Sequence, residues 1–207
     1  MAGRFSITVL ISGGGTTLRN LIKLQQSGEL KADIAAVISS SEAAAGNQFA
    51  LDANIPLTVL PRQAFPSATE LSKALFSTCR EHATDLVVAG GFLRRLVIAE
   101  DYENRVINIH PSLIPAFCGK GFYGTRVHQA VLEYGCKLSG CTVHFVDNEY
   151  DHGPIIAQQT VDVLPDDSAQ SLQKKIFLKE CELYPTVINQ IAMGQVRLSD
   201  RTVRIVK

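Results

Sequence analysis

The sequence predicts a doubly wound α/β domain, with a mostly parallel sheet and an antiparallel edge in its C-terminal half. Short apolar, β-branched runs alternate with segments whose apolar residues recur at helical spacing, which is typical of strand–helix units. A triple glycine follows the first run, and two later runs succeed each other without a helix between them. The length of 207 residues suits one domain that spans residues 1–207.

The first half is predicted to alternate strand and helix. The run FSITVLIS at 5–12 predicts a strand, and the pattern that opens at Thr16 and Thr17 predicts the helix after the glycines. Further strands are expected at 33–41, 57–60 and 85–92, and further helices at 44–54 and 69–83.

The second half opens with the run VINIHPS at 106–112, a strand whose extension stops at Pro111. A glycine-rich and aromatic loop follows at 115–126. The expected order is then a helix at 127–134, a strand pair at 140–148 and 154–164, a helix at 168–193 and a closing hairpin at 195–206. Pro185 is expected to kink or divide the last helix.

Composition excludes several classes of protein. The chain is 46% hydrophobic and carries 20 basic against 20 acidic side chains, with basic clusters no longer than pairs, so no nucleic-acid partner is expected. No run approaches the roughly 18 apolar residues of a membrane helix, and we expect a cytoplasmic protein without a membrane partner. Five cysteines without a C-x-x-C pair predict reduced, mostly structural thiols.

The loop ISGGGTTL indicates an anion site, because a helix start after glycines offers backbone N–H groups and the positive end of the helix dipole. No Lys follows the glycines and Leu18 replaces the last glycine of the dinucleotide pattern. Serines at 39–41 stand where a ribose-binding carboxylate would be expected. A single phosphate monoester is therefore favoured over ATP or NAD. The alternative is a tight turn in which the threonines are plain helix caps.

Alternation along a strand places Asn108 and His110 on one face, with Cα atoms roughly 7 Å apart. An imidazole moves protons near neutral pH, and an amide donates to an oxygen that gains negative charge, so the pair suits acyl transfer. Asp151, in the loop NEYDHGP, is expected to favour the imidazolium and raise the pKa of His110. The alternative is a satisfied interior pair and a turn-forming Asp.

Neither a nucleophile nor a metal site accompanies this pair. The sequence has no G-x-S-x-G elbow, and its histidines, among them His128, His144 and His152, lack the spacing of a ligand set. No metal is therefore expected.

Four motifs in order resemble the phosphoribosylglycinamide formyltransferase family of folate-dependent formyltransferases: VLISGGGTTLRNLI, INIHPSLIPAF, GCTVHFVD and DHGPIIAQ. The resemblance covers roughly residues 5 to 192 and implies a Rossmann-like formyltransferase fold. It also implies transfer of a formyl group from 10-formyltetrahydrofolate, as co-substrate, to the amine of glycinamide ribonucleotide in de novo purine synthesis.

The resemblance further implies the site residues. Asn108, His110 and Asp151 would be catalytic, in a direct transfer without a covalent enzyme intermediate. The folate would contact the backbone and apolar groups of the segment Leu93, Arg94, Arg95 and Leu96, together with Asn108. The ribonucleotide would contact Gly15, Thr16 and Thr17 through its phosphate, and Glu180, for which a solvated face among lysines is the alternative. The expected assembly is a monomer or a homodimer.

Three features depart from the family pattern, and one of them is His152, which occupies a position often filled by glycine or another small residue. Ala68 falls where bacterial members often have an Arg for the folate glutamate tail, and Arg62 lies upstream. The loop at 117–126 is longer than in the shortest members, and its Lys120, Tyr123 and Arg126 offer alternative anion or ring contacts.

The alternatives fall into two classes. Within the superfamily they are a formyltetrahydrofolate hydrolase and a sugar-amine or methionyl-tRNA formyltransferase, which use a similar Asn, His and Asp set. From a different class, a non-catalytic nucleotide-binding module gives no reason for that set, and an NAD-type dehydrogenase requires an acidic residue near position 40.

Overall fold

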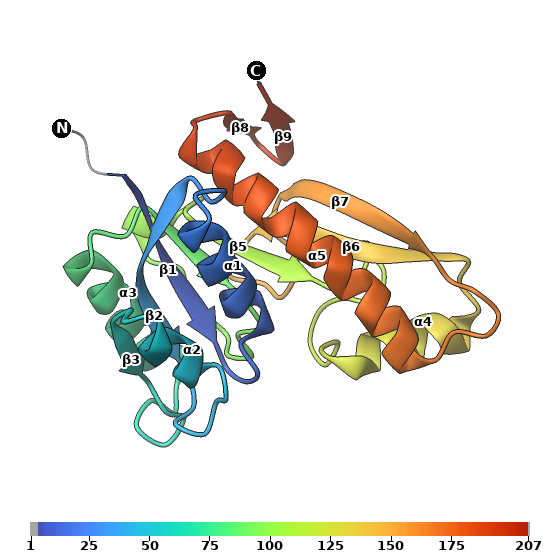
Figure 1. Ribbon diagram of the computed structural model, residues 1–207, viewed down its shortest axis with the longest axis horizontal. Coiled ribbons are helices and arrows are strands. Elements are labelled where there is room, and N and C mark those ends of the chain that lie inside the picture. Colours follow the sequence, from blue (N-terminus) through green and yellow to red (C-terminus); the bar gives the residue numbers. More distant parts are fainter. Residues whose placement is uncertain (1–3, 207) are drawn as a thin grey trace. The chain divides into compact units, whose positions relative to one another are not determined.

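The structure is a computed structural model that describes residues 4–206, and its chain divides between Ile107 and Asn108 into two compact units (Figure 1). In the first unit four parallel strands lie in the order β3-β2-β1-β4. These are β1 (Phe5–Ile11), β2 (Ala32–Ser39), β3 (Leu57–Val59) and β4 (Leu86–Ala89). Strand β5 (Val106–His110) begins beside β4, because the Val87 N–H donates to the Arg105 carbonyl at 2.8 Å.

Helices follow each of the first three strands, as parallel pairing requires. They are α1 (Thr16–Gln26), α2 (Asn47–Asp52) and α3 (Ala68–Glu81), and a short 3-10 helix η1 (Glu100–Tyr102) precedes β5. The last five residues of β1 are buried, which fits a strand covered on both faces. Helix α3 begins with a capping box in which Ser67 and Glu70 satisfy each other's backbone N–H groups. The first unit thus presents the carboxyl ends of its strands, followed by loops, at one edge.

The second unit is built around an antiparallel strand pair, β6 (Leu138–Phe145) and β7 (Ile155–Asp162). Helix α5 (Ala169–Ala192) packs on both strands and on α4 (Thr125–Tyr134). The chain then forms the hairpin of β8 (Val196–Ser199) and β9 (Thr202–Ile205), and β9 contacts β7. Figure 1 shows the hairpin directly after α5.

The predicted fold class is confirmed: the sheet is mostly parallel, with an antiparallel edge and a closing hairpin near the C-terminus. The sequence predicts that Pro185 kinks or divides the last helix. It does not divide the helix, because Pro185 lies inside one helix of 24 residues. Its surroundings Leu183, Tyr184 and Val187 are buried, and tertiary packing outweighs the roughly 3 kcal/mol that an interior proline costs. The single-domain assignment stays a prediction.

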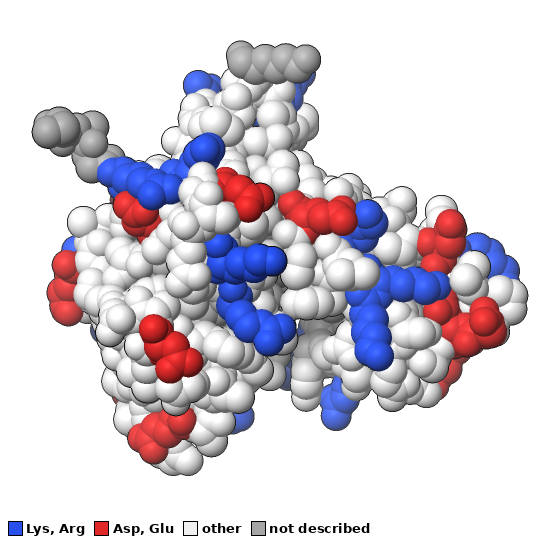
Figure 2. Space-filling model, in the orientation of Figure 1, with Lys and Arg blue, Asp and Glu red and all other residues white. Residues whose placement is uncertain are grey.

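The expected strand at 85–92 is shorter than predicted, since β4 ends at Ala89 and Gly91 adopts a φ of 79°. No helix within residues 4–206 has the length and apolar character needed to cross a membrane. On the face drawn in Figure 2, Lys and Arg side chains are interspersed with Asp and Glu.

Candidate active site

Asn108 and His110 lie at the end of β5, where the strand gives way to a loop. Their alternation places both side chains on one face, and His110 is 4% exposed whereas Asn108 is partly exposed. Ser112 follows in the loop, and its hydroxyl donates to the Ala116 carbonyl at 2.6 Å. Ser112 is therefore used to fold the loop back over the strand end.

The structure brings Asp151 to this pair. Its Oδ2 lies 3.5 Å from Nδ1 of His110, and its Oδ1 lies 3.5 Å from the amide nitrogen of Asn108. The backbone N–H of Gly119 donates to Oδ2 at 2.9 Å. The three residues predicted to be catalytic therefore form one cluster, with the carboxylate between the amide and the imidazole.

The hydrogen bonds of His110 determine which ring nitrogen carries the proton. Nε2 lies 2.9 Å from the Phe117 carbonyl oxygen, which only accepts, so Nε2 is the donor. In the neutral ring Nδ1 is then a free acceptor that faces Asp151.

The pKa of His110 departs from the expectation. Burial lowers it, and this effect exceeds the upward contributions of Asp151 and of the Phe117 carbonyl, so the net pKa lies below the usual value of 6.5. The contribution of Asp151 has the predicted sign, but the expected net rise is wrong. Near neutral pH the ring is neutral.

The carboxyl of Asp151 stays ionised. Burial raises its pKa, but the neighbouring His144 and His110 rings and the Gly119 N–H outweigh that effect, and the net pKa is lower than usual. The cluster near neutral pH is therefore a carboxylate beside a neutral imidazole with an open nitrogen.

His144 is a member of the site that sequence reasoning considered only as a metal ligand. Its Nδ1 donates to the Phe145 carbonyl at 2.8 Å, which leaves Nε2 to accept from the Asn108 amide at 3.3 Å. The same face of β6 carries Thr142, whose hydroxyl donates to the Ser112 carbonyl at 2.7 Å and accepts from the Ile114 N–H at 3.1 Å. The signal was present in the alternation of TVHF, where Thr142 and His144 share a face.

Gly153 lets the Asp151 loop approach β6 closely. A Cβ at this position would collide with the Phe145 carbonyl oxygen. The neighbouring Pro154 carbonyl accepts from the Phe145 N–H at 2.9 Å. A glycine is thus needed here for Asp151 to reach the strand end.

In the first unit the predicted phosphate loop connects β1 to α1. Gly15 is the N-cap residue of α1, with a φ of 66°, and no side chain caps the helix. The alternative in which the threonines serve as plain N-caps is therefore wrong. Thr16 is exposed and Thr17 partly so, and the first turn contains no acidic residue. The helix start offers N–H groups and two hydroxyls to an anion.

Close packing explains why residue 15 is a glycine. A Cβ there would lie 2.5 Å from Cα of Gly46 and 3.3 Å from the Phe49 ring. The N–H of Gly46 donates to the Gly13 carbonyl at 2.9 Å, so the segment before α2 supports the loop.

The segment predicted to line the pterin pocket also lies in the first unit. Leu93 is 58% exposed and its N–H donates to the Ser12 hydroxyl at 2.9 Å, whereas Leu96 is buried. Arg94 donates to the Phe65 carbonyl at 2.5 Å, and Arg95 is exposed. The start of this segment therefore lies beside the phosphate loop in the first unit, because the Leu93 N–H binds Ser12.

The residues considered for the folate tail differ in their surroundings. Ala68 is the first residue of α3, while Arg62 is exposed in the loop before it. Arg62 therefore remains a cation that a carboxylate can reach.

Glu180 lies on α5 and is partly buried. Burial raises the pKa of its carboxyl to about 7, which is the behaviour of a group largely withdrawn from water. Glu180 is therefore neither buried nor fully exposed, and its contact with the ribonucleotide stays a prediction.

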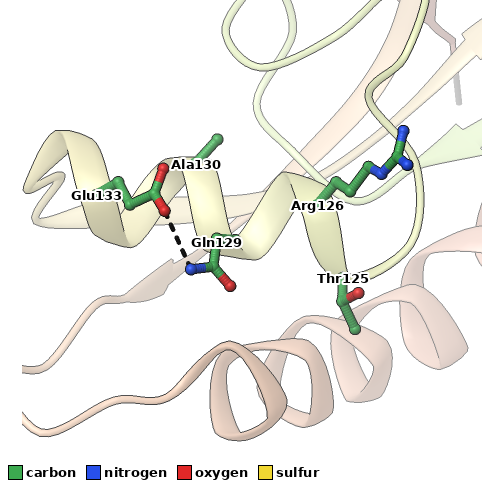
Figure 3. A pocket seen from close by; sticks show the side chains of 5 residues that line it. All are labelled: Thr125, Arg126, Gln129, Ala130 and Glu133. Carbon is green, nitrogen blue, oxygen red and sulfur yellow. Dashed lines mark hydrogen bonds between the residues drawn. The ribbon is translucent and has the colours of Figure 1, made fainter.

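A separate hollow of about 250 Å³ lies on α4 (Figure 3) and is lined by Thr125, Arg126, Gln129, Ala130 and Glu133. Gln129 donates to Glu133 at 3.0 Å across it. Arg126 also stacks 5.1 Å from the Tyr123 ring centre, so two of the three residues expected as alternative contacts are engaged with each other, while Lys120 is exposed.

The cysteines of the chain are all free thiols. Burial raises the pKa of Cys79 and of Cys141 to about 12. Cys118, on the loop beside Asp151, also has a raised pKa, first from burial and then from the Asp151 charge. None of these three thiols is activated as a nucleophile. Residues 4–206 contain no group of three His, Cys, Asp or Glu arranged to hold a metal ion.

Comparison with known proteins defines the class. A family model described as formyl transferase matches residues 5–188. A phosphoribosylglycinamide formyltransferase of Haemophilus influenzae is 36% identical over 196 residues, which cover 94% of this chain and 90% of the relative. A chloroplastic one from Arabidopsis thaliana is 33% identical, over 99% of this chain and 71% of the relative. The chain belongs to the formyl transferase family.

A solved structure agrees with these relatives. The crystal structure of glycinamide ribonucleotide transformylase 1 from Symbiobacterium toebii superposes with a TM-score of 0.92 at 35% identity, covering 100% of this chain and 96% of that one. The resemblance that four motifs predicted is thus confirmed, and within the family it is to phosphoribosylglycinamide formyltransferases.

Proposed function

We propose that the protein transfers a formyl group from 10-formyltetrahydrofolate to the amine of glycinamide ribonucleotide, in the cytoplasm and as part of purine synthesis. The observation that carries the proposal is the cluster of Asn108, His110 and Asp151 in a chain whose relatives of similar length act on this ribonucleotide. A binding module needs no such cluster, because an ionised carboxylate beside a buried imidazole serves proton transfer.

The geometry supports the following sequence of events. The ribonucleotide amine attacks the formyl carbon, and the carbonyl oxygen becomes an oxyanion. The Asn108 amide donates to this oxygen, since its 3.5 Å contact with Asp151 is weak and easily exchanged. Holding amine and formyl group together supplies much of the rate.

Proton movement falls to His110. Its ring is neutral near pH 7, with Nδ1 open toward Asp151, so it accepts the proton that the attacking amine loses. The resulting imidazolium stands beside the Asp151 carboxylate and stabilises the oxyanion. The proton then passes to the departing folate nitrogen, assisted by a water near Asp151. No activated thiol lies at this site, which favours direct transfer.

The ribonucleotide phosphate would bind at the start of α1, through Gly15, Thr16 and Thr17. The uncapped helix start supports this assignment, because its N–H groups and dipole favour an anion. Glu180 would contact the same substrate, and its raised pKa makes it sensitive to a nearby amine or hydroxyl donor. The backbone from Leu93 to Leu96 would bind the pterin, with Asn108 at the formyl end.

The test is an assay that distinguishes a formyltransferase from a formyltetrahydrofolate hydrolase. The protein is incubated with 10-formyltetrahydrofolate with and without glycinamide ribonucleotide, and folate absorbance is followed. Release of tetrahydrofolate only with the ribonucleotide is expected. Release without it would instead identify a hydrolase, and no release in either case would refute a role in formyl chemistry on these substrates.

A further inference from the structure

The carboxylate of Asp151 depends on a loop with little support of its own. Residues 146–154 contain neither helix nor strand, and Asp151 has a φ of 51°, in the left-handed region that aspartate and asparagine tolerate better than other residues with a side chain. Its contacts with Asn108 and His110 are long, at 3.5 Å each. The Gly119 N–H holds Oδ2 at 2.9 Å, but this bond fixes the carboxylate and not the backbone of the loop, so contacts beyond the cluster help to place that backbone.

The C-terminal hairpin supplies that support. Arg201, in the turn between β8 and β9, donates through Nη2 to the His152 carbonyl at 2.6 Å. Its Nη1 lies 3.4 Å from Nε2 of the same residue. The planar guanidinium thus contacts the backbone and the ring of the residue that directly follows Asp151.

The other side of His152 is held as well. Its Nδ1 lies 2.7 Å from Oδ2 of Asp147, whose Oδ1 accepts from the Glu149 N–H at 2.8 Å. Arg201 only donates, so Nε2 is the acceptor in this arrangement and Nδ1–H donates to Asp147. Each hydrogen bond from Arg201 through His152 to Asp147 thus joins one donor to one acceptor. We call Arg201, His152 and Asp147 the clamp.

We propose that Arg201 is a positioning residue for Asp151, and that it acts through His152 and the clamp on the loop that presents the carboxylate. The inference rests on the proposed function, since it assigns Asp151 a part in formyl transfer. Arg201 lies 50 positions after Asp151 in sequence and touches neither His110 nor Asn108 by any contact that the structure shows.

The clamp contributes more to the position of the Asp151 carboxylate than to the folding stability of the protein. His152 and Asp147 are 48% and 35% exposed, and a hydrogen bond between such exposed groups contributes little to folding because water competes for both partners. A catalytic group, in contrast, loses rate steeply with displacement, since a shift of about 1 Å can cost about a hundredfold. Removing Arg201 should therefore lower kcat strongly and leave the melting temperature nearly unchanged.

The kinetic test is the variant Arg201→Leu, which keeps an apolar side chain and removes the donors. We expect kcat to fall about tenfold to a hundredfold while KM for both substrates stays within about twofold. The matched control is Arg197→Leu in the same hairpin, because Arg197 donates only to carbonyls of Gly194 and Val196 in the contacts shown. Its kcat should equal that of the parent protein.

A double variant separates positioning from a general structural effect. In the Asp151→Asn background, Arg201→Leu should cause almost no further loss, because the group it positions has already lost its charge. Multiplying losses would overturn the proposal, since Arg201 would then act independently of Asp151.

A readout without substrates completes the test. The Gly119 N–H donates to Asp151 Oδ2, so its hydrogen exchange, followed by amide NMR, reports on the carboxylate. Exchange at Gly119 should quicken in Arg201→Leu and stay unchanged in Arg197→Leu; equal protection in both would overturn the proposal. If the parent protein fails to transfer formyl groups, the proposed function fails, yet the Gly119 measurement still decides whether Arg201 positions Asp151.

Discussion

Replacing Gly153 by alanine tests how closely the Asp151 loop must approach β6. The new Cβ would collide with the Phe145 carbonyl oxygen, and the loop backbone would have to withdraw by about 1 Å to restore contact distance. Asp151 lies two residues away and would move with it. A displacement of about 1 Å at a catalytic group predicts a loss of about a hundredfold in kcat.

The same change has a separate cost in stability. Overpacking costs about 1 to 3 kcal/mol, and the hydrogen bond from the Phe145 N–H to the Pro154 carbonyl adds about 1 kcal/mol if it is lost. For a chain of this length a loss of about 1 to 4 kcal/mol lowers the melting temperature by about 2 to 16 °C. The variant should therefore remain folded at 25 °C, where the assay is performed.

The assay compares kcat and KM for both substrates with thermal unfolding followed by circular dichroism. The control is Glu149→Ala in the same loop, since this exposed side chain makes no contact in the structure as described and only its N–H is used. We expect normal kcat in the control and the full loss in Gly153→Ala. A folded Gly153→Ala protein with kcat within about twofold of the parent would refute the claim that loop approach sets the position of Asp151.

Three further predictions follow from the site. Asn108→Ala and His110→Ala should fold normally but lose about 10² to 10³ in kcat, and near-normal turnover in either would contradict their assignment. The rate should rise with pH through the pKa of His110, which lies below 6.5, because the neutral ring is the active form; a pH–rate profile that falls across that range would contradict the sign. Glu180→Gln should raise the melting temperature at pH 8 and not at pH 4, because the folded state holds the Glu180 proton up to a pKa of about 7 whereas the unfolded chain releases it near 4.5; the resulting cost builds up between these two pH values and is complete above about 7. Equal melting temperatures at pH 8 would argue against it.

The fold was predictable because its signals are local. Apolar runs such as the one at 5–12 and helical spacing at 69–83 depend on neighbours in sequence, and the strands and helices found there match the prediction within a few residues. The 3-10 helix at Glu100–Tyr102 and the uninterrupted α5 were not predicted, because both depend on packing against distant segments.

The sequence by itself determined the parallel fold, the glycine loop before α1 and the shared face of Asn108 and His110, because each follows from local periodicity or spacing. Only the tertiary structure showed that Asp151 meets His110, that His144 binds Asn108, and that burial outweighs the Asp151 charge in the pKa of His110. Such relations depend on which groups far apart in sequence become neighbours and on how much water they lose. A catalytic cluster is defined by distances and solvation, and neither is encoded in the spacing of residues along one strand.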